Sequence, residues 1–189
     1  MMEEQEYLKQ YENRLQNSLT GLCTADGMMG DTLLESDDIE AKFTESLAKP
    51  YLNDAVREYQ QYPEAALAWA GYLGMAMAKF WDADWQTFQQ VRYTDLQSQR
   101  GFDDLDEQIV TRVLGYELDS EPARRIADTL SKCAAEALSM IRHEHIEAQS
   151  PRAYYVFART VQVFYRIGAS IELFHLGYKL ERLTPPFSV

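Results

Sequence analysis

Residue types that bind metals or form disulfides are scarce in this sequence. Its 189 residues include two cysteines and three histidines. Cys23 and Cys133 are far apart and neither belongs to a CxxC pair, so their spacing predicts neither a zinc site nor a disulfide framework. We expect two reduced thiols. His143 and His145 flank Glu144 without forming the HExxH motif of zinc proteases. The sequence therefore predicts no cofactor.

Long apolar runs and export signals are also missing. The first ten residues, MMEEQEYLKQ, carry acidic side chains where a secretion signal has a basic segment followed by an apolar one. The uncharged stretch 65–78, AALAWAGYLGMAMA, has fourteen residues, whereas a membrane-spanning helix needs about 20. These absences predict a cytoplasmic protein that makes no membrane contact.

The chain has no overall excess of basic residues. Its net charge of −12 repels phosphate backbones, so we expect no direct nucleic-acid binding. The charge is uneven: residues 1–121 have a net charge of −15 and residues 122–189 a net charge of +3. A hydrophobic content of 46% indicates a folded chain. We therefore expect the acidic part, 1–121, to dock against the basic part, 122–183, of the same chain or of a second copy.

Flexible linkers and alternating strand patterns are absent, and apolar residues recur at three- and four-residue steps. This periodicity predicts an all-α fold: a single domain over residues 1–189, a bundle of about six to seven helices that ends in a long antiparallel helical hairpin. The expected helices cover residues 3–20, closed by Gly21, then 37–59 with a kink or break at Pro50, 63–78, 81–100, 102–116, 120–149 and 152–183. Predicted caps are Asp37, then Asp119 or Ser120 before Pro122, and Ser150 before Pro151.

Residues 65–78 and the last helix are apolar on most sides, and we expect them to pack against each other. The small residues Ala66, Ala70, Gly74 and Ala78 would let the two backbones approach closely. The last helix changes its polar face near Gly168. Before it, the polar residues are Arg152, Arg159, Gln162, Arg166 and Ser170; beyond it, Glu172 and His175 lie on nearly the opposite side. The helix is expected to kink there or to pass between two sets of neighbours.

Glu172 and His175 are the candidate metal ligands. Their Glu-x-x-His spacing is the one by which di-metal bundles present two ligands on one helix face. Such a site needs a second motif and two further glutamates, and this chain has a single motif. Only a sharp break at Gly168 would bring the other histidines near Glu172 and His175. The spacing of the pair alone therefore gives little support to a metal site. His145 lies on the apolar stripe of its helix and is interpreted as a partly buried, hydrogen-bonded residue.

Aromatic and basic residues supply the candidates for a ligand pocket. Trp69, Tyr72, Trp81 and Trp85 fall within the aromatic segment 65–88 and could line a pocket, although such spacing is typical of core residues. Arg159 and Arg166, with Arg152, recur every seven residues and could bind an anionic ligand or an acidic partner. The favoured interpretation pairs them within the hairpin, with Glu147 near Arg152 and Glu136 near Arg166.

These patterns predict a non-enzymatic binding or regulatory protein that acts through protein–protein contacts, with itself as a homo-oligomer or with another protein. The alternative is a small-ligand-binding protein or a metal-dependent enzyme, with its site between the aromatic segment 65–88 and the C-terminal helix. No serine, cysteine or lysine lies beside a recognisable base, so nucleophilic catalysis has no support.

Overall fold

A computed structural model of the chain describes residues 2–179, and the fold within this range is all-α. The principal helices and short helical segments are α1 (Met2–Ala25), α2 (Asp37–Lys42), α3 (Ala48–Gln61), α4 (Pro63–Phe88), α5 (Leu105–Gln108), α6 (Glu121–His143) and α7 (Pro151–His175). The described residues contain no strand; Ser98 and Gly101 form an isolated bridge. None of these helices is long and apolar enough to cross a membrane.

Helix α1 is longer than the apolar pattern predicts. It continues through Gly21, the expected end, to Ala25. The reason is Cys23, which extends the apolar face by one turn after Leu19 and is fully buried. The chain leaves the helix through Gly27, whose positive φ of 73° suits glycine. The following loop is consequently shorter than expected.

The predicted interruption at Pro50 is present. α2 is capped by Ser36, whose side chain accepts a hydrogen bond from the Ile39 amide, so the cap lies one residue before the expected Asp37. A π-helical turn, Phe43–Leu47, then separates α2 from α3, and Pro50 lies in the first turn of α3. The π-helical turn runs directly into α3, since the Ala48 amide donates to the Phe43 carbonyl. Proline has no amide hydrogen to donate to the preceding turn, and the regular hydrogen-bond pattern is interrupted just before it.

Helix α4 starts at Pro63 as expected and runs past the apolar segment to Phe88, with a non-helical residue at Asp84. The chain between α4 and α6 forms short elements: two 3₁₀ turns, Tyr93–Leu96 and Phe102–Asp104, then α5 and a π-helical turn, Ile109–Val113. The helix predicted over residues 81–100 does not form as a single helix. Residues 81–88 are the end of α4, and residues 93–96 form a 3₁₀ turn.

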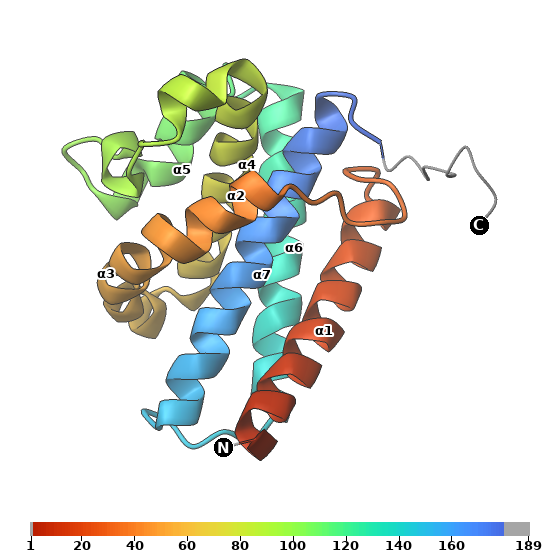
Figure 1. Cartoon of the computed structure of the whole chain (residues 1–189), viewed down its shortest axis with the longest axis vertical. Helices are drawn as coiled ribbons and strands as arrows, with labels where there is room; N and C mark the ends of the chain where they lie inside the picture. Colours follow the sequence, from red (N-terminus) through yellow and green to blue (C-terminus); the bar gives the residue numbers. More distant parts are fainter. Residues whose placement is uncertain (1, 180–189) are drawn as a thin grey trace, which may run out of the picture.

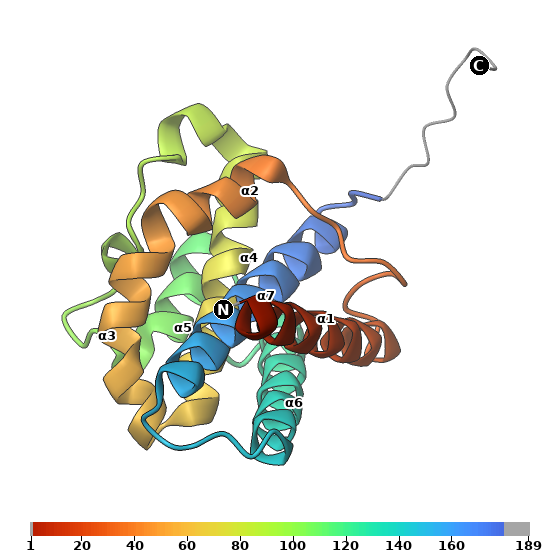
Figure 2. The same cartoon turned by 60° about the horizontal axis from the view of Figure 1, so that its bottom comes forward.

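The last two long helices begin as predicted and end early. Ser120 and Ser150 cap α6 and α7 through hydrogen bonds from Ala123 and Ala153. α6 ends at His143, not near residue 149, and α7 ends at His175, not near residue 183; residues 180–183 lie outside the described range. The two helices run in opposite directions, but the loop 144–150 spans the space between their ends (Figure 2), and each packs mainly on α1 and α4.

The α4–α7 contact is the most extensive in the fold, as the small residues predict. In Figure 1, α7 runs through the middle of the molecule between α1 on one side and α2 and α3 on the other. Gly168 of α7 lies so close to Gly71 that an added Cβ would be 2.9 Å from the Gly71 Cα and closer still to its carbonyl oxygen. At Gly74 an added Cβ would lie 2.8 Å from the Ala169 nitrogen. Glycine at these positions lets the two backbones touch.

Candidate functional site

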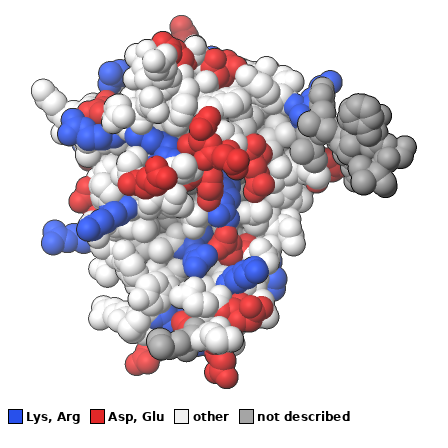
Figure 3. All heavy atoms as spheres, in the orientation of Figure 1, with Lys and Arg blue, Asp and Glu red and all other residues white. Residues whose placement is uncertain are grey.

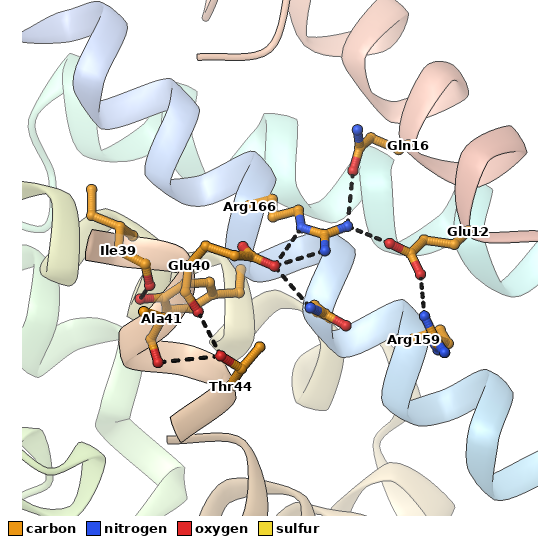
Figure 4. A network of polar contacts seen from close by, with 10 residues as sticks. Glu12, Gln16, Ile39, Glu40, Ala41, Thr44, Arg159 and Arg166 are labelled. Atoms are coloured by element: carbon orange, nitrogen blue, oxygen red, sulfur yellow. Dashed lines mark hydrogen bonds and ion pairs between the residues drawn. The ribbon is translucent and has the colours of Figure 1, made fainter. Parts of the chain in front are cut away.

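The polar face in the first half of α7 is occupied by ion pairs to the N-terminal part of the chain (Figure 4). Arg159 contacts Glu12 at 2.7 Å, and Arg166 bridges Glu12 and Glu40, the latter also at 2.7 Å. Arg152 pairs with Glu4 at 2.5 Å. The expected pairing of these arginines with Glu147 and Glu136 is therefore wrong, because α7 packs this face against α1 and α2 rather than against α6.

This network has an electrostatic consequence inside the protein. The arginines on either side of Glu12 hold the pKa of its half-buried carboxyl below the usual value, in spite of burial that acts in the opposite direction.

Arg166 lies beside a small cavity of about 140 Å³ near Glu40, but its guanidinium already binds Glu12, Gln16 and Glu40. The docking of the acidic part on the basic part thus occurs within one chain. Figure 3 shows acidic and basic side chains interspersed on this face.

The opposite polar face, at the C-terminal end of α7, borders a cavity of about 380 Å³. Its walls come from the loop after α1, from α4, from the chain after α5, from the start of α6 and from the end of α7. The lining residues are Gly27, Met28, Met75, Tyr116, Glu121, Pro122, Arg125, Ile126, Ile171, Glu172, Phe174 and His175. Met75, Ile126, Ile171 and Glu172 are buried, whereas Glu121, Arg125 and His175 are exposed. The cavity therefore has a mostly apolar floor and a charged rim.

Glu172 is the unusual residue of this floor. Its side chain is 2% exposed, yet no described residue donates a hydrogen bond to its carboxylate. Burial raises the pKa of Glu172 from 4.5 to about 7, while Lys79 and Asp82 on α4 act on it in opposite directions. At neutral pH the group is poised between a neutral acid and an unpaired carboxylate.

The other buried polar side chains are all satisfied within the described residues. Lys42 donates to the Gln89 carbonyl, and Asp104 accepts from Ser98 and Gln108. The remaining three are Thr129, Thr160 and Ser170, bonded to Asp26, to Tyr11 and to the Leu34 amide. No side-chain oxygen or nitrogen in the described residues is both fully enclosed and without a partner. The Glu172 carboxylate, to which no described residue donates, is therefore accessible from the cavity, where a ligand could bind it.

Two further contacts fix the rim. The Tyr116 hydroxyl lies 2.6 Å from His175 Nε2, which holds the imidazole at the cavity mouth. Arg125 donates to the carbonyl of Asp26 at 3.1 Å, beside the loop glycine Gly27. Asp26 in turn pairs with Lys132 at 3.1 Å and accepts from Thr129. The mouth is thus assembled from three separate parts of the sequence.

The aromatic candidates are distributed over other parts of the molecule. Trp69 and Tyr72 line an open groove of about 580 Å³ between α4 and α6, and Trp85 lines a cleft of about 630 Å³ beside α2 and α3. Trp81 donates to Asp38 and lies 5.5 Å from the Tyr178 ring, centroid to centroid. Arg159 and Arg166 are on the far side of α7 from Glu172. The predicted site residues therefore do not converge on one site: Glu172 and His175 share the cavity at the end of α7, and Trp69 and Tyr72 share the groove between α4 and α6.

Sequence reasoning missed Tyr116 and Arg125 as neighbours of Glu172, since nothing local links these segments. Within residues 2–179 no cluster of three His, Cys, Asp or Glu side chains could hold a metal. His145 was expected to be partly buried; it is exposed in the turn after α6, with a φ of 53°, because that helix ends at His143. Comparison with protein-family models, with curated proteins and with solved structures finds no match to this chain.

Proposed function

We propose that this protein binds a small molecule with an apolar body and a protonated amine, in the cavity between the start of α6 and the end of α7. The observation that carries the proposal is Glu172, a buried carboxylate on the cavity floor to which no described residue donates a hydrogen bond. The volume of about 380 Å³ lies within the range of small-molecule sites.

The chemistry of the walls supports an amine over other ligands. An ammonium group supplies both the missing hydrogen bonds and the missing positive charge, and such charge-assisted bonds are about twice as strong as neutral ones. Met75, Ile126 and Ile171 would cover the apolar body of the ligand. The acidic net charge of the protein attracts cations to its surface.

Titration calorimetry of the whole chain with matched probes tests the proposal. 2-Phenylethylamine and 2-phenylethanol have the same shape and differ in charge. At pH 8, where Glu172 is ionised and the amine protonated, the amine is expected to bind at least about tenfold more tightly, because a hydrogen bond to a charged group contributes roughly 1.5–3 kcal/mol. The preference is expected to decrease at pH 5, where Glu172 is neutral.

Glu172→Gln is expected to remove the preference for the amine and to keep the weak binding of the alcohol. Glu107→Gln is the control, since it removes the same charge from an exposed residue outside the cavity. Equal binding of amine and alcohol by the unmodified protein, or an amine preference that survives Glu172→Gln, would contradict the proposal.

Action through protein–protein contacts is a second proposal. It is favoured by the exposed tyrosines Tyr154 and Tyr155 in the first turns of α7, which are 40% and 50% exposed. The charge asymmetry that motivated it is already used in ion pairs within the chain. Sedimentation of the purified chain at micromolar concentration distinguishes a homo-oligomer from a monomer.

A further inference from the structure

Two thiols face each other where α1 packs on α6. The Sγ atoms of Cys23 and Cys133 are 3.6 Å apart, and both side chains are fully buried. They are separated by 110 positions in the sequence. A disulfide has an S–S distance of about 2.05 Å, so the two sulfurs would have to approach each other by about 1.5 Å to be joined.

We propose that Cys23 and Cys133 are a redox modification site, at which a peroxide converts the two thiols into an intramolecular disulfide that fastens α1 to α6. Both cysteines are free thiols in this structure, as the sequence predicts. Their spacing carries no information about the α1–α6 contact, which brings the two thiols together. The inference is independent of the nature of any ligand in the cavity.

The chemistry balances with hydrogen peroxide as the oxidant. The Cys23 thiolate attacks one peroxide oxygen, the O–O bond breaks, and a sulfenic acid and one water result. The Cys133 thiolate then attacks the Cys23 sulfur, the S–S bond forms, the S–O bond breaks, and the departing hydroxide takes a proton to give a second water. Two thiols and one peroxide thus yield one disulfide and two waters.

Cys23 is the residue that meets the oxidant first. It lies in the last turn of α1, two residues before the helix ends at Ala25, and terminal turns open more often than helix interiors. Cys133 lies in the middle of α6, where its hydrogen bond with Cys23, and then burial, raise the pKa of its thiol. A raised thiol pKa slows the second step, so the disulfide is expected to form slowly.

The position of the pair connects it to the cavity wall. Asp26 follows Cys23 by three residues and pairs with Lys132, the neighbour of Cys133. Arg125 of α6 binds the Asp26 carbonyl, and Gly27 and Met28 line the cavity. A bond between the two sulfurs would therefore hold the loop that forms this wall against α6.

The test exposes the reduced, folded full-length chain to hydrogen peroxide and follows its mass and thiol content over hours. The expected product has lost two hydrogen atoms, has no titratable thiol after denaturation, and yields a tryptic peptide in which residues 15–42 are linked to residues 133–142. Its thermal unfolding midpoint is expected to rise by about 10 °C, because a cross-link that closes a loop of this length restricts the unfolded chain strongly.

Cys133→Ala provides the matched control: peroxide is expected to leave it without the linked peptide and without the shift in midpoint. Two thiols still titratable after prolonged treatment of the unmodified chain would overturn the proposal. So would cross-linked dimers as the main product, or further oxidation to sulfinic acid without the linked peptide.

Discussion

Replacement of Glu172 by glutamine is expected to stabilise the folded protein at pH 8 and to change its stability little at pH 5. The substitution keeps the shape of the side chain and removes the charge that burial disfavours. Its effect depends on pH because the amide resembles the neutral acid, which is the form that the folded protein prefers below pH 7.

The magnitude follows from the pKa of this one group. Burial raises the pKa of Glu172 from 4.5 to about 7, and each pH unit corresponds to about 1.4 kcal/mol. The folded protein holds the proton more tightly than the unfolded chain does. The stabilisation by this proton is therefore complete below pH 4.5 and is lost as the pH rises to 7. The charged carboxylate then costs the folded state about 3 kcal/mol, which Glu172→Gln recovers.

Urea unfolding of both proteins at pH 5, 6, 7 and 8 measures this effect as the difference in their free energies of unfolding. The difference is expected to be under about 1 kcal/mol at pH 5 and to approach about 3 kcal/mol at pH 8. Glu107→Gln, at an exposed position, is expected to show no such trend. A difference that stays constant across the pH range, or a glutamine variant less stable at pH 8, would refute the reasoning about burial.

Two further predictions concern the packing and the ion pairs around α7, and both are measured by urea unfolding. Gly168→Ala is expected to cost about 3 kcal/mol because its Cβ overlaps the Gly71 backbone, whereas Gly21→Ala, in open space inside α1, is expected to gain roughly 0.5–1 kcal/mol. Arg166→Met is expected to cost about 3 kcal/mol above pH 4.5, decreasing as the pH falls through the lowered pKa of Glu12. Arg159→Met is expected to cost under about 1 kcal/mol, because Arg159 is more exposed and Glu12 keeps Arg166.

Local features of the fold could be predicted because their causes are local. Ser150 followed by Pro151 caps a helix with its own hydroxyl and a first-turn proline, whatever packs around it. The α4–α7 contact could also be predicted, because a helix that is apolar on most sides and rich in small residues needs a close neighbour. α7 is a single helix through Gly168, so the second of the two alternatives holds: its polar face changes because its neighbours change.

The site could be predicted only in part, since it depends on which segments meet. Glu172 and His175 share a helix face, and the sequence places them together. Tyr116 and Arg125 join them only through the path of the chain after α5 and the direction of α6, which no spacing encodes. The same limit explains the wrong partners for the arginines, because antiparallel register was assumed between helices that pack mainly on others.

The two polar faces of α7 differ in a way that bears on function. On the first face every arginine has a carboxylate partner, so the ionic groups there contribute to the assembly of the chain. On the second face no residue within 2–179 donates to the Glu172 carboxylate, although each of the other buried polar side chains in that range is paired. An unpaired buried acid costs about 3 kcal/mol above pH 7, which is a large part of the stability of an ordinary domain. Residues that reduce stability in this way are typical of sites where binding requires them. The cost would be offset by a cation that enters the cavity, so the stability of the protein and its affinity for an amine are expected to change in opposite directions when Glu172 is replaced.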